Sequence, residues 1–199
     1  MRKKQFIIGI DEAGRGPLAG PVCVGAVLVK KDFDFSIFPH LNDSKKMTKK
    51  RRDVVYNELD SMCKSNSSIQ FSTGFASAND IDKYGIQQAI SVSINNGLKN
   101  LEITPAEVTI FLDGGLKAPQ IYKQKTVIGG DGLLQVISLA SVVAKVSRDR
   151  KMLQFDQKYP LFNFAQHKGY GTKDHREAIG KYGLSPIHRK SYTQNIITP

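Results

Sequence analysis

Four acidic side chains stand just after three short apolar runs in this chain of 199 residues, and glycines follow each of them. They are Asp11 and Glu12 after the first run, Asp113 after the second and Asp131 after the third. If the three runs are neighbouring strands, their ends bring four carboxylates to one edge of a sheet. Four uncompensated carboxylates repel one another, and oxygen ligands favour Mg²⁺ or Mn²⁺. The pattern therefore predicts a divalent-metal site.

The charge of the chain indicates which chemistry such a site would perform. The formal net charge is +11 at pH 7, and an excess of this size favours polyanions such as nucleic acids. Two divalent cations about 3.5–4 Å apart can activate a water molecule and stabilise the leaving oxygen of a phosphodiester. A carboxylate cluster in a strongly basic protein therefore predicts metal-assisted cleavage of phosphodiesters.

A glycine-rich stretch follows the first two acids and consists of Gly14, Arg15 and Gly16. Glycines allow backbone N–H groups to approach a ligand closely. The stretch begins like a dinucleotide-binding fingerprint, but that fingerprint opens a helix, whereas Pro17 and Pro21 interrupt this segment. The chain also contains no phosphate-binding P-loop motif. The two acids taken alone remain compatible with the polar end of an ordinary strand.

Apolar periodicity predicts the elements that position these side chains. We expect strands at residues 6–10, 22–29, 69–75, 108–112 and 126–128. We expect helices after an N-cap at Thr48 and over residues 80–101, 133–158 and 172–181. Basic residues crowd the start of the first helix, where they oppose the helix dipole. This basic cluster is either a solvated face or a phosphate-binding patch.

The length and composition indicate one domain, or one domain with a small appendage. Hydrophobic residues make up 40% of the chain, but no apolar run approaches the roughly 20 residues that cross a membrane. Cys23 and Cys63 are far apart in the sequence and match no metal-binding spacing. We therefore expect a cytoplasmic protein without a membrane partner.

Six parts of the chain together resemble the ribonuclease HII family. They are residues 9–17, 42–46, 112–114, 140–146 with 148–149, 167–172 and 185–189. Each segment alone is a modest match. The set is highly specific, because the segments occur in the family order across nearly the whole chain.

The resemblance implies an α/β fold of the RNase H type, with a mixed sheet flanked by helices and a small helical C-terminal part. It implies a catalytic domain over residues 1–160, and a helical substrate-binding extension of the same compact unit over residues 161–199. The implied activity is endonucleolytic cleavage of RNA in RNA–DNA hybrids, together with incision 5′ of single ribonucleotides embedded in duplex DNA. The products would carry a 5′-phosphate and a 3′-hydroxyl.

The resemblance also assigns roles to individual residues. The four acids match the catalytic carboxylates of the family, which would hold Mg²⁺ or Mn²⁺. Gly14, Arg15 and Gly16 match the element that reads the ribose 2′-hydroxyl, the group that distinguishes RNA from DNA. Tyr170 matches the tyrosine that packs on the sugar at the junction. Lys45, Lys145 and Arg148 could each be a phosphate contact or ordinary surface charge, and we expect a phosphate contact at Lys45 in particular.

The chain departs from the family pattern at Gly130 and at Leu139, which replaces a common alanine. Gly130 stands where the family usually has a lysine before the fourth acid. The related ribonuclease HIII family carries threonine at the position of Arg15, so incision at single ribonucleotides is the better expectation for this chain. The C-terminus lacks the aromatic pair of a sliding-clamp-binding peptide. We therefore expect a monomer that binds hybrids and ribonucleotide-containing duplexes, without a sliding clamp.

One alternative from another functional class remains open at this point. The chain could be a non-catalytic module that binds hybrids and retains its acids without using them. The intact set of four acids favours the enzyme. We assign no metal to His167, His175 or His188, because isolated histidines are more often structural or exposed.

Overall fold

The computed structural model describes residues 5–39, 41, 47–65, 68–101 and 103–197. Of these, Asp131, Leu133 and Ile197 are described by their backbone alone. Lys45 and the rest of segment 42–46 lie outside the described residues, so the expected phosphate contact of Lys45 stays a prediction.

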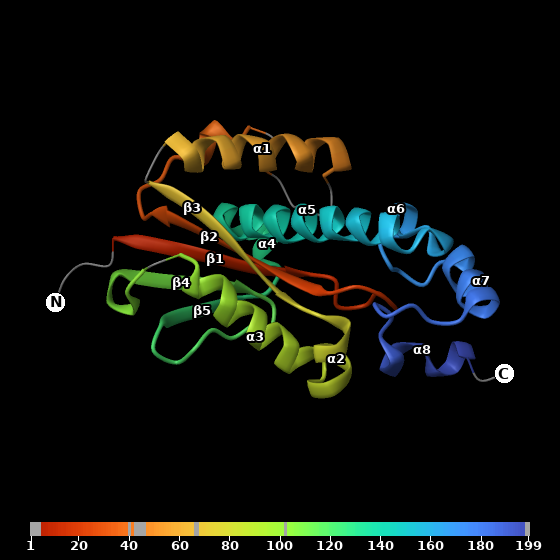
Figure 1. Cartoon of the computed structure of the whole chain (residues 1–199). Coiled ribbons are helices and arrows are strands. Elements are labelled where there is room, and N and C mark those ends of the chain that lie inside the picture. The colour runs from red at the N-terminus through yellow and green to blue at the C-terminus, as the bar shows by residue number, and fades with distance from the viewer. Residues whose placement is uncertain (1–4, 40, 42–46, 66–67, 102, 198–199) are drawn as a thin grey trace.

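A five-stranded sheet forms the centre of the fold, with the strand order β3-β2-β1-β4-β5 (Figure 1). The strands are β1 (Phe6–Ala13), β2 (Val22–Lys30), β3 (Ile69–Ala76), β4 (Val108–Asp113) and β5 (Lys123–Val127). β1 and β2 are antiparallel, as are β2 and β3, whereas β4 is parallel to both β1 and β5. The predicted mixed sheet is therefore confirmed, and β1 lies at its centre.

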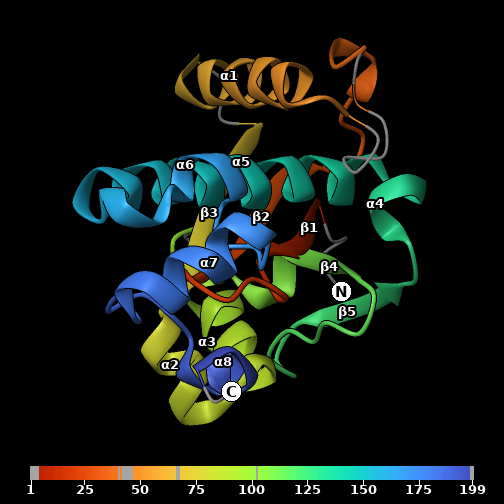
Figure 2. The same cartoon turned by 90° about the vertical axis from the view of Figure 1, so that its right-hand side faces the viewer.

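Helices cover both faces of this sheet (Figures 1 and 2). The helices of the layers are α1 (Lys49–Ser65), α2 (Ala78–Tyr84), α3 (Ile86–Lys99) and α5 (Gln135–Lys158). α5 packs on β1 and β2 and is itself covered by α1, whereas α3 packs on β2 and β3 from the other face. Two apolar cores result, one on each face, because side chains of a strand alternate between the faces.

Two glycines bring α5 against the backbone of the sheet. A Cβ atom on Gly9 would lie 2.2 Å from the carbonyl oxygen of Val136, and one on Gly25 would lie 2.3 Å from that of Ala140. No real side chain tolerates such distances, so both positions require glycine. The close approach places the second turn of α5, which contains Ser141, next to the end of β1.

The structure corrects three of the predicted elements. The helix expected over 80–101 is two helices, α2 and α3, because Gly85 between them has a φ of 79° that most residues avoid. The strand expected at 126–128 is β5, an edge strand that ends at Val127 and exposes its lysines to solvent. The helix expected from 133 begins at Gln135, and a separate short helix, α4 (Gly130–Leu133), precedes it.

The C-terminal part packs against the far end of α5 (Figure 1). It contains α6 (Phe164–His167), α7 (Lys173–Tyr182) and α8 (Lys190–Ile197), and the predicted N-cap Thr172 accepts a hydrogen bond from the His175 amide. A third apolar cluster joins Phe162 and Phe164 to Met152 of α5 and to Ala19 of the β1–β2 loop. No helix in the described ranges has both the length and the apolar character needed to span a membrane.

Candidate active site

Two of the four acids lie side by side at the ends of adjacent parallel strands. Ile10 of β1 pairs with Leu112 of β4, so Asp11 and Asp113 occupy the next position of each strand. Residues at matching positions of neighbouring strands point to the same face of the sheet. Both acids line one cavity of about 520 Å³. The structure therefore brings together the ends of two apolar runs that are separated by about half the chain.

Asp11 is buried and resists ionisation. Its side chain is only 5% exposed, and burial raises the pKa of Asp11 from 3.8 to about 7, helped by repulsion from Glu12 and Asp113. A hydrogen bond with Ser141 and one from the Glu12 amide, 2.7 Å from Oδ1, lower the pKa in part. A nearby positive charge would favour the ionised form.

Asp113 fixes the position of the helix that carries the fourth acid. Its Oδ1 accepts a hydrogen bond from the backbone N–H of Gly130 at 2.6 Å, which attaches the start of α4 to the end of β4. Asp131 is therefore not at the end of a strand, as its sequence pattern predicts, but within α4. The backbone of Asp131 lies one residue from this contact, and its side chain is not among those described.

Glu12 lines the same cavity, but its carboxylate forms an ion pair with Arg15. Its Oε1 accepts a hydrogen bond from Nη1 of Arg15 at 2.9 Å. Within the described part of the chain, no three carboxylate, histidine or cysteine side chains form a metal-binding group in this arrangement. Asp11 and Asp113 nonetheless fit a divalent cation, because they offer adjacent oxygens and the buried carboxylate lacks a compensating charge.

The glycine-rich loop forms one wall of the cavity. Gly14 adopts a φ of 98°, and a Cβ atom there would lie 2.1 Å from Nε of Arg148, so the position requires glycine. The carbonyl oxygens of Gly14 and Arg15 accept hydrogen bonds from the buried Arg189 at 2.6 and 2.8 Å. Arg15 and Gly16 are exposed and line the cavity.

Tyr170 forms part of the cavity wall, and the residue is 44% exposed. Two histidines fix the backbone of Tyr170. The Tyr170 N–H donates to the carbonyl oxygen of His167 at 2.9 Å, and the Tyr170 carbonyl oxygen lies 2.9 Å from Nδ1 of His175. His167 and His175 therefore hold the backbone that carries this ring.

Basic side chains complete the lining. Lys145 and Arg52 both line the cavity, and Nζ of Lys145 also forms an ion pair with Asp149 at 2.8 Å. The ring of Tyr170 has the ammonium nitrogen of Lys145 and the guanidinium carbon of Arg148 each 5.8 Å from its centroid. Cations such as Lys145 and Arg52 beside an acidic cluster suit the path of a phosphate backbone. Arg148 is fully buried, so it is neither the phosphate contact nor the surface charge that the sequence left open.

Sequence reasoning misses two residues of this region and leaves the role of a third open. Ser141 and Arg189 lie in segments that resemble the family, but their spacing alone gives them no role. Arg52 belongs to the basic cluster at the start of α1, which the sequence leaves open as either a solvated face or a phosphate-binding patch. Each acquires its neighbours only through the fold.

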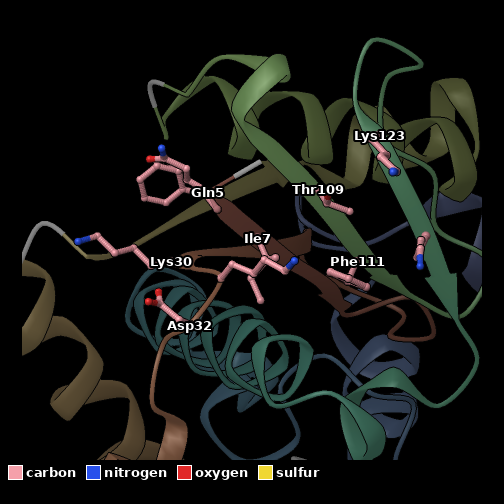
Figure 3. Close-up of a pocket in the computed structure, with 10 residues that line it drawn as sticks. Gln5, Ile7, Lys30, Asp32, Thr109, Phe111 and Lys123 are labelled. Atoms are coloured by element: carbon pink, nitrogen blue, oxygen red, sulfur yellow. The ribbon is translucent and has the colours of Figure 1, made fainter. Parts of the chain in front are cut away.

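A second, larger cavity contains none of the predicted site residues. It measures about 990 Å³ and lies at the opposite ends of the strands, where Figure 3 shows Ile7 and Phe111 between Lys30 and Lys123. Asp32 is the one acid among the described residues that line it. A cavity without clustered carboxylates does not match the predicted chemistry, so size does not locate the candidate site.

Comparisons with known proteins match nearly the whole chain to one family. The family model described as Ribonuclease HII matches residues 8–195. A Ribonuclease HII from Caldicellulosiruptor bescii is 41% identical over 195 residues, which cover 98% of this chain and 89% of the relative.

Three solved structures share the fold. The ribonuclease H2 from Pyrococcus horikoshii OT3 has a TM-score of 0.75 at 22% identity, with 96% of this chain and 97% of that chain covered. RNase HII of Archaeoglobus fulgidus, solved in complex with PCNA, has a TM-score of 0.70 at 20% identity, with 92% and 93% covered. Bst-RNase HIII in complex with Mn²⁺ has a TM-score of 0.70 at 14% identity, with 98% and 71% covered.

The match to the family model and the identity to the curated relative extend over almost the full length of the chain. The solved structures, all below 25% identity, support the fold alone. The chain belongs to the ribonuclease HII family, whose members are divalent-metal-dependent endonucleases that hydrolyse RNA in RNA–DNA hybrids.

Proposed function

We propose that this chain cleaves the RNA strand of RNA–DNA hybrids and also incises 5′ of single ribonucleotides embedded in duplex DNA. The products are a 5′-phosphate and a 3′-hydroxyl. The observation that carries the proposal is the placement of Asp11 beside Asp113 in a cavity that the loop of Gly14, Arg15 and Gly16 also lines. A site for cleavage and a site for reading the ribose are thereby adjacent.

Asp11, Glu12, Asp113 and Asp131 are the proposed holders of Mg²⁺ or Mn²⁺. Bound cations would activate the attacking water and stabilise the leaving oxygen. Asp11 provides a carboxylate that the Ser141 and Glu12 hydrogen bonds hold in one orientation. Glu12 must leave Arg15 to join the set, and this exchange frees the Arg15 guanidinium for the substrate.

The rest of the cavity wall is proposed to hold the substrate. The amides at Arg15 and Gly16 face the position of a ribose 2′-hydroxyl, and the exposed ring of Tyr170 packs on the neighbouring sugar. Lys145 and Arg52 contact phosphates, as does Lys45 outside the described residues. These contacts orient the strand so that one phosphodiester lies against the carboxylates.

The remaining expectations complete the proposal. Residues 161–199 act as the substrate-binding extension of one compact unit with residues 1–160, and they contribute Tyr170. The protein works as a cytoplasmic monomer on hybrids and ribonucleotide-containing duplexes. The RNase HII of Archaeoglobus fulgidus was solved with PCNA, and a sliding clamp is not part of this proposal.

A nicking assay tests the proposal. A labelled DNA duplex with one ribonucleotide is incubated with the protein and Mg²⁺ or Mn²⁺, and the ends are mapped. We expect one nick, 5′ of the ribonucleotide, that leaves a 3′-hydroxyl. An all-DNA duplex should stay intact, and chelation of the metal should stop the reaction. Binding of the ribonucleotide duplex without any nick would instead favour the non-catalytic module.

A further inference from the structure

Arg189 is fully buried, and its guanidinium donates hydrogen bonds to backbone carbonyl groups. Its Nη2 donates to the Gly14 carbonyl oxygen at 2.6 Å and its Nη1 to that of Arg15 at 2.8 Å. Its Nε donates to the Gly20 carbonyl oxygen at 3.0 Å, and none of its surface is exposed. One side chain from the C-terminal part thus holds both ends of the β1–β2 loop.

These bonds determine where the amides of the loop point. In a trans peptide the C=O group and the following N–H group point in opposite directions. Because the Gly14 and Arg15 carbonyls point inward to Arg189, the N–H groups of Arg15 and Gly16 point outward, on the side of the cavity. Neither N–H group has a hydrogen-bond partner among the described residues.

We propose that Arg189 is a positioning residue for ribonucleotide recognition: by drawing two carbonyls inward, it presents the Arg15 and Gly16 amides as a pair of donors to the ribose 2′-hydroxyl. The inference rests on the proposed function and adds to it a residue far from the cleaved bond. Arg189 does not itself touch the substrate, since the loop separates it from the cavity.

The chemistry of the site explains why arginine is required there. A planar guanidinium has five N–H donors in a fixed fork, whereas an ammonium group cannot hold three carbonyls in one plane. Arg189 forms no salt bridge with a described residue, and burying an unpaired charge is costly. The carbonyl groups it holds offset this cost, which indicates a role in the shape of the loop.

A second buried arginine supports the same loop. Arg148 donates to the carbonyl oxygens of Pro21, Ala19 and Lys168 at 2.9, 3.2 and 3.0 Å. It holds the later part of the loop and the segment before Tyr170, whereas its hydrogen bonds to described residues do not include the Gly14 or Arg15 carbonyls. The direction of the two outward amides therefore depends on Arg189.

A binding experiment separates this role from a general loss of stability. Arg189→Lys keeps the charge and removes the planar fork. The control is Asp82→Asn, because Asp82 attaches the start of α8 by accepting the N–H groups of Lys190 and Ser191 at 2.8 and 3.0 Å. Both changes are made in the full chain carrying Asp11→Asn, so that the duplex is not cut.

Dissociation constants are measured for a duplex with one ribonucleotide and for the matching all-DNA duplex. We expect Arg189→Lys to reduce the preference for the ribonucleotide about tenfold, the effect of one to two hydrogen bonds. Asp82→Asn should keep the preference for the ribonucleotide within about twofold of its original value, even if it lowers the melting temperature as much as Arg189→Lys does. An unchanged preference in Arg189→Lys, or an equal loss in both variants, would overturn the inference.

A second measurement needs no change at Arg189. Backbone amide NMR signals of Arg15 and Gly16 should shift with the ribonucleotide duplex and not with the all-DNA duplex. Equal shifts with both duplexes would refute the positioning role even if Arg189→Lys failed to fold. Failure of the unmodified chain to nick the ribonucleotide duplex would count against the proposed function, whereas nicking with an unchanged preference in Arg189→Lys counts against this inference alone.

Discussion

Replacing Asp11 with asparagine should make the metal-free protein more stable while it abolishes cleavage. The carboxylate lies in a buried position beside Glu12 and Asp113, and the pKa of Asp11 is raised there to about 7. Above that pH the folded chain must keep a buried negative charge without a compensating cation. Asparagine has nearly the same shape and can still accept the hydrogen bond from the Glu12 amide, but it carries no charge.

The size of the effect follows from linkage between protonation and folding. The pKa of Asp11 is 3.8 in the unfolded chain and about 7 in the folded chain, a difference of about 3 units. Each unit corresponds to about 1.4 kcal/mol, so ionisation destabilises the fold by up to about 4 kcal/mol above pH 7. Because the pKa of Asp11 is raised in the folded chain, this destabilisation is absent below about pH 4 and grows as the pH rises to about 7.

Chemical unfolding in a metal chelator tests this prediction at pH 8 and at pH 4. Asp11→Asn should be more stable than the unmodified chain at pH 8, and the difference should vanish at pH 4. Asp60→Asn provides a control, because Asp60 lies in an exposed ion pair with Lys64 and should change stability by less than about 1 kcal/mol. If Asp11→Asn is no more stable than the unmodified chain at pH 8, the buried charge of Asp11 does not destabilise the fold.

Three further outcomes follow from the same contacts. The pKa values of His175 and His188 are lowered to about 4, chiefly by burial, so stability present above pH 6.5 is lost as the pH falls towards 4; denaturant midpoints in the Asp11→Asn background should show this decline, and a flat profile would contradict it. Gly14→Ala should destabilise the fold by about 2 kcal/mol or more, because of its positive φ and the Arg148 contact; Gly16→Ala has open space around it and should change the unfolding free energy by less than about 0.5 kcal/mol. Tyr170→Ala should weaken binding of a ribonucleotide duplex about tenfold, as for a lost stacking contact, whereas Tyr170→Phe should bind nearly as well; equal binding by all three proteins would show that the ring does not contact the substrate.

The strands that carry the first three acids could be predicted from the sequence, because an apolar run of strand length is a local signal. β1 and β4 lie where the runs 6–10 and 108–112 predict them, although β1 continues through Asp11 and Glu12 to Ala13. Their adjacency is not a local property. It rests on the parallel register between the two strands, which the resemblance to a known family supplies and which composition does not.

Other features depend on contacts that no local pattern encodes. The break at Gly85 separates two helices that share one apolar stripe, so periodicity alone joins them. β5 is an edge strand with exposed lysines, and it begins three residues before the expected strand and ends one residue before it. The bonds of Arg189 reach carbonyl groups more than 160 residues away in the chain, and only the folded loop reveals them.

In the proposed function, Asp11 and Asp113 hold a divalent cation between adjacent parallel strands. A crystal soaked in Mn²⁺ tests it most directly, because anomalous scattering locates manganese without reference to activity. We predict a manganese peak within coordination distance of both carboxylates, about 2.0–2.3 Å from an oxygen of each, and no such peak in crystals of Asp11→Asn. Manganese bound elsewhere, with neither carboxylate among its ligands, would contradict the account.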